Sequence, residues 1–365
     1  MARTRVPLAV SRLPLIGALA MTACSTAGTA SQPPPEGSSV PSPSASASPS
    51  SGPGESGPAE VADDRLEAMF EIGGGPDLPT EAFGSLWVLT VDGELMGDGT
   101  PPSVQRIDPA TNEVIASVEI EGRLCQGIGA SPEALWACGP DGVVRIDPAT
   151  NSVVAEVPFD APLVTSRLAY GAGSIWAFAT AAVGPDTVVR IDPATNTVAA
   201  TIPLGHAAGT LAFGLDALWV TSRTDDLVLR IDPATNAVEP WSTGIEGAGQ
   251  IAVAGDSLWV SLYGEHGAQA PDGAPTIVRI DAATGDVTAE IDAGAGLEDS
   301  NGIFATEDAV WVRGTDPFLV SIDPATAEIA DEIGGNYSTG DVAVAFGSVW
   351  ATSETGRVMR IAPEP

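Results

Sequence analysis

The sequence predicts an all-β fold in which one four-stranded unit is repeated. Three observations support this prediction. The heptapeptide RIDPATN recurs at a spacing of about forty residues, complete copies starting at Arg106, Arg145, Arg190 and Arg230 and weaker ones at Arg279 and Ser321. A tryptophan precedes each copy in a short apolar run such as LWV or IWA. Gly, Pro, Asp and Asn separate these runs, which is typical of strands in a meander. Together they indicate a β-propeller, with one blade for each repeat.

The amino terminus, residues 1–23, has the pattern of a signal peptide. Three Arg precede an apolar run from Leu13 to Met21, which is too short to span a bilayer. The ending Met-Thr-Ala-Cys24 resembles the lipobox of bacterial lipoproteins, which implies lipidation of Cys24 and attachment to the extracellular face of the cytoplasmic membrane. Residues 18–20 suit an ordinary signal peptidase, so a secreted form is the alternative.

Residues 24–62 are rich in Ser, Pro, Gly and Ala and contain no aromatic side chain. A segment of this composition has little to bury in a core, so we expect a disordered tether. The folded domain is then residues 63–365.

The RIDPATN motif predicts the turn between the third and fourth strands of each unit. In the second copy, Asp147 can cap a turn, Pro148 supplies the fixed backbone angle, and Asn151 tolerates the left-handed conformation. Arg145 lies two residues before Asp147 on the same strand face, so we expect the two side chains to pair within or between copies. This assigns Asp147 a structural role.

Seven tryptophans occupy one position of the repeat: Trp87, Trp136, Trp176, Trp219, Trp259, Trp311 and Trp350. We interpret them as wedges packed between adjacent sheets, with an aromatic ligand box as the alternative. The seventh copy stops after its third strand, with Ala362 in the place of the turn Asp. Leu66 to Ile72 matches the missing fourth strand. Pairing the two ends of the domain leaves no open sheet edge, so we predict a closed ring of seven blades.

The repeat LWV…VxRIDPATNxV resembles the YVTN-type, YncE-like β-propeller repeat of bacterial extracytoplasmic proteins, over nearly all of residues 63–365. This resemblance implies a protein that mostly binds other molecules. A YncE-like relative binds DNA, but the present chain has no Lys and a formal net charge of −33, which becomes −36 without residues 1–23. Nucleic-acid binding depends on cationic contacts with phosphates, so we expect no nucleic-acid partner. The acidic surface favours solubility, cations or basic partners, and general surface acidity without a binding role is the interpretation we prefer.

Two long loops mark the expected mouth of the central channel, residues 90–103 and 263–276. The second contains Glu265 and His266, and the other histidine, His206, lies in a loop on the same face. With Asp225 and Asp226, these side chains could bind a divalent metal such as magnesium or calcium, or supply a general base. They lack metal-ligand spacing, so the main expectation is no cofactor.

The fold also resembles virginiamycin B lyases, whose chemistry uses histidine and glutamate with magnesium. This resemblance makes His206, Glu265 and His266 the catalytic candidates. In that family the second strand ends in an LWFTE-like segment, whereas LWVLT, LWVTS and LWVSL lack the acid. The lyase is therefore the alternative to a non-enzymatic module that binds a protein or a small molecule at the mouth.

Four arginines outside the RIDPATN turns map to the mouth or channel: Arg123, Arg167, Arg223 and Arg313. Their guanidinium groups could bind an anionic ligand or a partner's carboxylate, and local salt bridges are the alternative.

Cys125 and Cys138 lie on neighbouring predicted strands of one unit. Outside the cytoplasm such a pair is mostly structural, so we expect a disulfide between them.

Overall fold

The computed structural model describes residues 64–91, 101–120, 127–159, 167–179, 186–222, 224–263, 276–294, 302–314, 317–335 and 338–363. These residues form seven four-stranded antiparallel sheets. The search for membrane spans, limited to the same residues, finds no helix that is long and apolar enough to cross a bilayer. The predicted signal peptide and tether lie outside the described residues.

The sheets are the blades of a propeller, each written here from its inner strand to its outer strand. Blades 1 to 4 are β2 (Gly75–Ala82), β3 (Ser85–Val91), β4 (Ser103–Asp108), β5 (Glu113–Glu119); β6 (Ile128–Ala130), β7 (Leu135–Gly139), β8 (Gly142–Asp147), β9 (Ser152–Pro158); β10 (Ala169–Gly171), β11 (Ser174–Ala179), β12 (Thr187–Asp192), β13 (Thr197–Pro203); and β14 (Leu211–Gly214), β15 (Ala217–Ser222), β16 (Leu227–Ile231), β17 (Val238–Thr243). Blades 5 to 7 are β18 (Ala248–Ala254), β19 (Ser257–Leu262), β20 (Ile277–Asp281), β21 (Val287–Ile291); β22 (Ile303–Ala305), β23 (Val310–Arg313), β24 (Leu319–Ile322), β25 (Ile329–Ile333); and β26 (Val342–Ala345), β27 (Ser348–Ser353), β28 (Arg357–Ile361), β1 (Leu66–Glu71).

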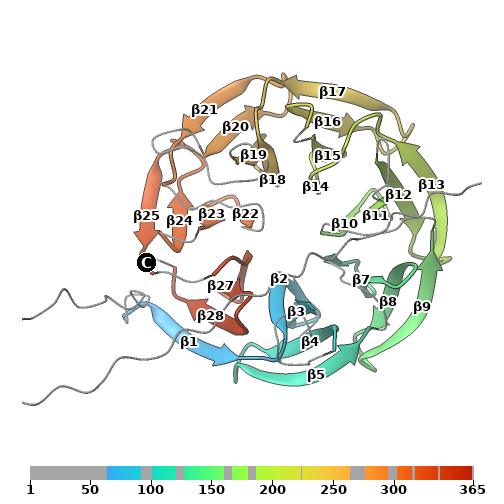
Figure 1. Ribbon diagram of the computed structural model, residues 1–365, viewed down its shortest axis with the longest axis vertical. Coiled ribbons are helices and arrows are strands. Elements are labelled where there is room, and N and C mark those ends of the chain that lie inside the picture. The colour runs from blue at the N-terminus through green and yellow to red at the C-terminus, as the bar shows by residue number, and fades with distance from the viewer. Residues whose placement is uncertain are drawn as a thin grey trace, which may run out of the picture. The chain divides into compact units, whose positions relative to one another are not determined.

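The blades close into a ring. Each inner strand contacts the inner strand of the next blade, and β26 contacts β2, which completes the circuit around the channel (Figure 1). β1 pairs antiparallel with β28, from Leu66 opposite Ile361 to Glu71 opposite Arg357. The amino-terminal strand therefore supplies the outer strand of the last blade, and the predicted seven-bladed fold and its closure are confirmed.

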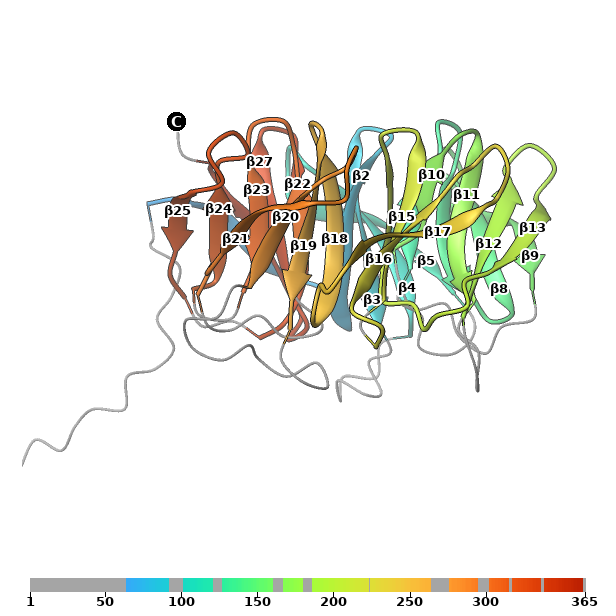
Figure 2. The ribbon, with the colours of Figure 1, turned by 90° about the horizontal axis from the view of Figure 1, so that it is seen from above.

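Because the strands of each blade are antiparallel, the connections between them alternate between the two faces of the ring. Loops between second and third strands, and loops into the next blade, share one edge, which we call the mouth face; turns within the 1–2 and 3–4 hairpins share the other, which we call the turn face. Figure 2 shows the ring from the side, with hairpin turns such as that of β27 along its upper edge. The two faces therefore carry different parts of each repeat.

Apolar packing between neighbouring blades holds the ring together. The described side chains fall into interblade clusters, and each cluster contains the repeat tryptophan of one blade. Trp136, for example, packs with Ile175 and Val189 of the following blade. The repeat tryptophans are at most 4% exposed, so the prediction of packing wedges is confirmed.

The RIDPATN motif joins one blade to the next. Nη1 of Arg106 donates to the carbonyl oxygen of Pro148 at 2.7 Å and to Oδ1 of Asn151 at 3.0 Å, both in the turn of blade 2. We call this pair of bonds the interblade latch. Its equivalents join blades 2 to 3 and 3 to 4, and Arg360 of blade 7 donates to the Pro109 carbonyl of blade 1 at 2.6 Å.

The latch corrects one prediction and supports another. The pairing expected between Arg145 and Asp147 is wrong, because Arg145 reaches Pro193 and Asn196 of blade 3 instead. Asp147 is a turn cap, as predicted: its Oδ1 accepts from the amide of Ala149 at 2.8 Å. The turn asparagines have φ between 51° and 60°, in the left-handed region that Asn tolerates.

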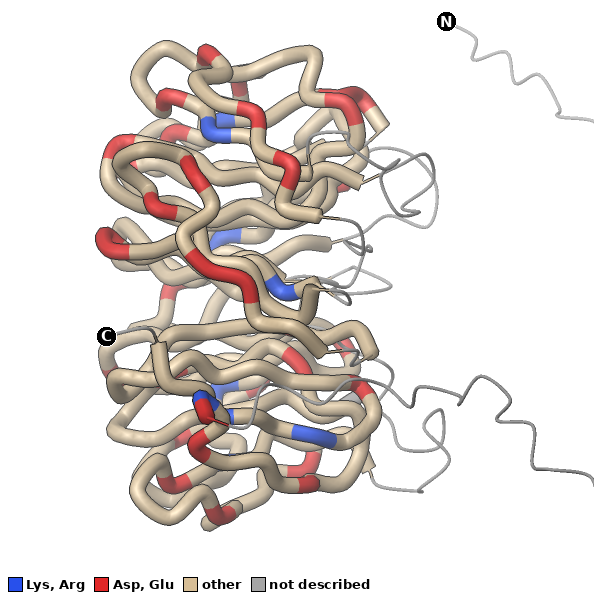
Figure 3. The backbone as a smooth tube through the Cα atoms, turned by 90° about the vertical axis from the view of Figure 1, so that its left-hand side faces the viewer, with Lys and Arg blue, Asp and Glu red and all other residues tan. Residues whose placement is uncertain are grey.

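Acidic residues greatly outnumber basic ones in the ring. Figure 3 shows acidic positions spread over the visible side of the chain, with far fewer basic ones. Six repeat arginines, such as Arg106 over Trp87 at 5.0 Å, stack on the tryptophan of their own blade. Much of the basic charge is therefore used inside the architecture.

Candidate functional site

One position of the repeat lies at the mouth end of every inner strand. It lies nine residues before the tryptophan in blades 2 to 7, and ten before it in blade 1, where β2 has a register shift between Asp77 and Thr80. We call these residues the mouth ring: Asp77, Gly127, Arg167, Thr210, Gln250, Gly302 and Asp341. Three of the seven carry charge.

An ion pair crosses the channel within the mouth ring. Nη2 of Arg167, which precedes β10 of blade 3, pairs with the carboxylate of Asp341, which precedes β26 of blade 7. The same nitrogen lies 3.4 Å from the carbonyl oxygen of Val342. Blades 3 and 7 are on nearly opposite sides of the ring (Figure 1), so this contact lies across the channel.

The backbone around Asp341 fixes its carboxylate. Its Oδ1 accepts from the amide of Val342 at 2.7 Å, and its own amide donates to Oγ1 of Thr352 at 2.9 Å. A Cβ on Gly302 would lie 1.6 Å from Oδ1 of Asp341. Glycine at position 302 therefore leaves the space that this carboxylate occupies, and Asp341 itself is only 3% exposed.

Asp77 is a second buried carboxyl group at the mouth, 6% exposed. Its Oδ1 accepts from the amide of Leu78, a residue in the left-handed region at φ 49°. Burial raises the pKa of Asp77 to about 7, the negative charge of Asp341 adds to this rise, and the guanidinium of Arg167 opposes it. Near neutral pH, this carboxyl group is therefore poised to exchange a proton.

A groove adjoins this cluster at the seam between blades 7 and 1. It has a volume of ≈ 560 Å³ and is lined by Glu71, Ile72, Gly73, Gly74, Glu354, Thr355 and Gly356. Glu354 also raises the pKa of Asp77 through its charge, and its Oε2 accepts from Oγ1 of Thr339 at 2.8 Å. The groove is thus acidic and open at the mouth face.

His206 and Asp225 meet on the mouth face, as their loops predict. Nδ1 of His206 lies 3.1 Å from Oδ2 of Asp225, and Oγ of Ser222 donates to the same oxygen at 3.1 Å. The hydrogen bond with His206 is the main cause of a lowered pKa for Asp225. Asp226 instead caps the backbone, since its Oδ1 accepts from the amide of Gly247 at 3.4 Å.

The rest of the predicted metal and catalytic set is only partly described. Glu265 and His266 lie outside the described residues, so their distance from His206 stays a prediction. Among the residues that the structure describes, no group of three or more His, Cys, Asp and Glu side chains is placed to hold a metal ion. The proposed metal site thus has one described pair, His206 with Asp225.

Arg313 has a structural environment. Its side chain is fully buried and stacks 4.2 Å from the Phe318 ring, and its nitrogens donate to the backbone carbonyls of Gly314, Phe318, Ser338 and Thr352. These described contacts are local bonds to backbone carbonyls, so both the predicted anion site and its alternative, local salt bridges, stay predictions for Arg313. Arg123 and Arg223 lie outside the described residues, and Arg167 is therefore the described member of the four at the channel.

Cys138 lies on β7, is fully buried and is disulfide-bonded. Cys125 and the lipidation candidate Cys24 are outside the described residues, so the pairing of Cys125 with Cys138 stays a prediction.

The mouth ring contains two acids that sequence reasoning missed, Asp77 and Asp341. A usable signal was present: Arg167 and Asp341 stand at the same offset from Trp176 and Trp350. Aligning the first strands on their tryptophans therefore identifies the channel-lining position. The bulge in β2 shifts Asp77 by one residue and hides it from a strict alignment.

Comparison with known proteins supports the fold. No family model and no curated protein matches the sequence, so the YVTN-type assignment stays a prediction. The structure is similar to virginiamycin B lyase from Staphylococcus aureus (14% identity, 81% of this chain and 99% of that one, TM-score 0.63). It is also similar to the computationally designed protein Ika8 (13%, 82% and 98%, 0.56) and to BamB from Moraxella catarrhalis (14%, 80% and 83%, 0.51). At these identities the similarity shows a shared β-propeller fold alone.

Proposed function

We propose that this protein is a non-enzymatic binding module, tethered to the extracellular face of the cytoplasmic membrane through Cys24, that engages a protein or small-molecule ligand at the mouth face. The observation that carries the proposal is the Arg167–Asp341 pair across the channel, with Asp77 buried beside it. It supplies a fixed charged cluster at the mouth ends of the inner strands. Rigid scaffolds that present variable loops are suited to recognition.

The charge of this cluster indicates the class of ligand. Asp77, Asp341 and Glu354 supply three carboxyl groups against the one guanidinium of Arg167. The adjoining groove, which Glu354 also lines, adds Glu71. An excess of carboxylates attracts cations, so the preferred ligand presents an amine or a basic side chain.

The test uses site-specific photo-crosslinking in intact cells that make the full chain. A photo-reactive residue at Thr355, exposed on the mouth face, is compared with one at Thr195, exposed in a hairpin turn on the opposite face. We expect a discrete adduct from position 355 alone. Equal labelling from both positions, or none from 355, would argue against a mouth-face module.

The membrane attachment has its own test. With Cys24→Ala, we expect the protein to leave the membrane fraction and appear in the medium, because the substitution removes the residue that would carry the lipid. Release of the unaltered chain to the same extent would favour the secreted alternative.

The lyase alternative is supported by the structural similarity to virginiamycin B lyase and by the His206–Asp225 pair. It requires Glu265 and His266 to come within reach of His206. Incubation of the protein with virginiamycin B and magnesium distinguishes the two functions. Ring opening that is lost in the Glu265→Ala, His266→Ala variant would establish the enzyme and refute the non-enzymatic module.

A further inference from the structure

The junction between blades 5 and 6 lacks the interblade latch. Arg279 of blade 5 occupies the latch position, but the turn of blade 6 reads DPATA, so Ala327 stands where the latched junctions have Asn. Nε of Arg279 donates to Oγ of Ser257 at 2.8 Å, and Nη2 lies 3.4 Å from Oδ1 of Asp256. Both partners belong to blade 5 itself. Arg279 therefore makes no latch to the described residues of blade 6.

Ala327 keeps the backbone conformation of the missing asparagine. Its φ is 58°, within the range of the turn asparagines, and it packs against the same apolar cluster as Trp259. The backbone of the turn is thus retained, while the carboxamide acceptor is missing and Arg279 makes no bond to the carbonyl oxygen of Pro324.

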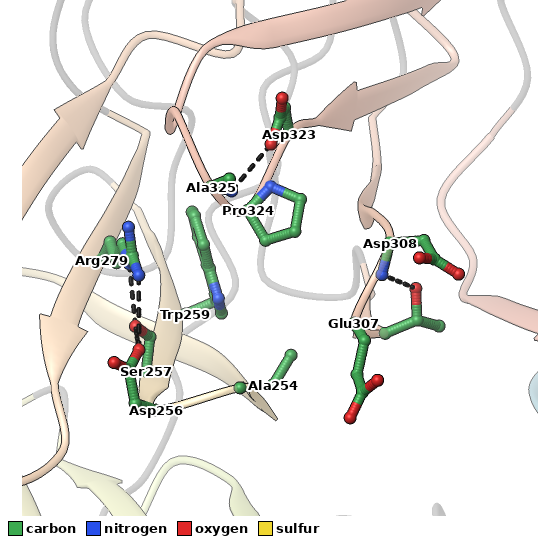
Figure 4. A pocket seen from close by; sticks show the side chains of 12 residues that line it. Ala254, Asp256, Ser257, Trp259, Arg279, Glu307, Asp308, Asp323, Pro324 and Ala325 are labelled. Carbon is green, nitrogen blue, oxygen red and sulfur yellow. Dashed lines mark hydrogen bonds and ion pairs between the residues drawn. The ribbon is translucent and has the colours of Figure 1, made fainter.

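A cavity of ≈ 440 Å³ lies at this junction, on the turn face. Trp259 and Arg279 of blade 5 line it together with Pro324 and Ala325 of blade 6 (Figure 4). The guanidinium is 5.6 Å from the centre of the Trp259 ring, and the Arg279 side chain remains 25% exposed. The volume falls within the range of sites that bind small molecules and short peptide segments.

The same site contains a second unused donor. In five other blades the indole N–H of the repeat tryptophan donates at 2.9–3.0 Å to an acceptor five residues earlier. Nε1 of Trp259 is buried and has no hydrogen-bond partner in the described structure. A buried N–H without an acceptor is costly, so this indole marks the 5–6 junction as less completely satisfied than those five blades.

The neighbouring junction, between blades 4 and 5, also lacks the turn Asn, having Gly285. A cavity of ≈ 390 Å³ lined by Arg230 and Trp241 is present there too, but its arginine has more partners. Arg230 of blade 4 bonds Oε1 of Glu239 at 2.8 Å, and its guanidinium lies 5.2 Å from the Trp241 ring and 6.0 Å from the Trp219 ring. Arg279 has neither a bonded Glu nor a second tryptophan over it among the described residues, so the 5–6 cavity is the more available site.

The rim of the cavity decides the chemistry of the ligand. Asp256, Glu307, Asp308 and Asp323 line the cavity together with Arg279, with Asp256 beside the guanidinium and Glu307 and Asp308 across the cavity from it (Figure 4). An anionic carboxylate would be repelled by these four acids. A neutral carboxamide has an oxygen to accept from Arg279 and an NH2 group to donate to the rim.

We propose that the cavity between blades 5 and 6 binds the carboxamide side chain of an asparagine in a partner peptide, which supplies in trans the group that Asn151 and its equivalents supply within the latched junctions. The site is separate from the mouth face and does not depend on the function proposed there. Its specificity comes from the acceptor that Arg279 lacks from blade 6 and from the acidic rim, which excludes aspartate.

The test measures binding of three blocked peptides to the full chain by ligand-observed saturation-transfer NMR. The probe is acetyl-Gly-Asn-Gly-methylamide, and the matched controls carry Ala or Asp in place of Asn. We expect the Asn peptide to bind at least about tenfold more tightly than either control. Equal binding of the Asn and Ala peptides would overturn the proposal, and tighter binding of the Asp peptide would overturn the argument from the rim.

Two protein variants complete the test. Ala327→Asn places the carboxamide in the chain itself, in a residue type that four other turns already hold, so it should complete the latch and abolish peptide binding. Arg279→Lys keeps the charge but removes the planar fork, and should weaken binding about tenfold. If Ala327→Asn binds the Asn peptide as tightly as the unaltered chain, the carboxamide site is refuted.

Discussion

Removing one latch asparagine should destabilise the ring by a measurable and separable amount. Asn151→Ala deletes the 3.0 Å bond from Arg106 and leaves the bond to the Pro148 carbonyl in place. A hydrogen bond to a charged donor contributes about 1.5–3 kcal/mol, and we take about 1 kcal/mol for this partly exposed one. At φ 51° alanine loses the tolerance of asparagine for the left-handed region, about 1 kcal/mol more. The expected loss is about 2 kcal/mol.

Thermal unfolding followed by circular dichroism provides the assay. For a domain of about 300 residues, about 2 kcal/mol corresponds to a fall in melting temperature of about 3 °C. Asn151→Asp is the control, because aspartate retains an acceptor and tolerates the same backbone region. It should melt within about 1 °C of the unaltered chain.

The reverse substitution tests the same reasoning at the open junction. Ala327→Asn, at φ 58°, should raise the melting temperature by about 3 °C, because asparagine tolerates the left-handed backbone conformation better than alanine and offers Arg279 an acceptor. A double-mutant cycle between Asn151→Ala and Arg106→Met should give a coupling of about 1 kcal/mol. No coupling, or a lower melting temperature for Ala327→Asn, would refute the assignment of the latch as the stabilising contact.

Three further predictions concern the mouth ring. Burial raises the pKa of Asp77 to about 7, so the folded chain retains a proton that the unfolded chain loses above about pH 4, and this group's contribution to stability falls as the pH rises from about 4 to about 7. Asp77→Asn should therefore stabilise the chain more at pH 8 than at pH 5 in thermal melts, and an equal effect at both values would contradict this. Gly302→Ala should lower the free energy of unfolding by about 2–3 kcal/mol, because the added Cβ would displace the Asp341 carboxylate. Gly334→Ala is the control: no atom lies within 4 Å of its added Cβ, so the free energy of unfolding should change by less than about 1 kcal/mol. Similar denaturation midpoints for the two variants would disprove the close approach at Gly302. Arg167→Met should lower the free energy of unfolding, measured by chemical denaturation, by about 3–5 kcal/mol because it leaves Asp341 buried and unpaired. Adding Asp341→Asn should restore part of this loss. No recovery in the double variant would show that the two side chains are not coupled.

The sequence by itself determined the architecture. The RIDPATN turns and the seven tryptophans define the repeat, and the missing fourth strand at Ala362, together with the spare strand from Leu66 to Ile72, predicts the closure that β1 and β28 make. These features are readable because turn chemistry and strand alternation are local properties, which each short segment expresses wherever it lies in the chain.

Only the tertiary structure decided which side chains meet. Arg145 was expected to pair with Asp147 two residues away, but the curvature of the ring brings it to the turn of the next blade. Arg167 and Asp341 are 174 residues apart and touch only because the ring closes around a narrow channel. The sequence contains the repeat position that they share, but the distance across the channel follows from the number of blades and their packing. Local patterns therefore specified the blades, and closure of the ring created the site.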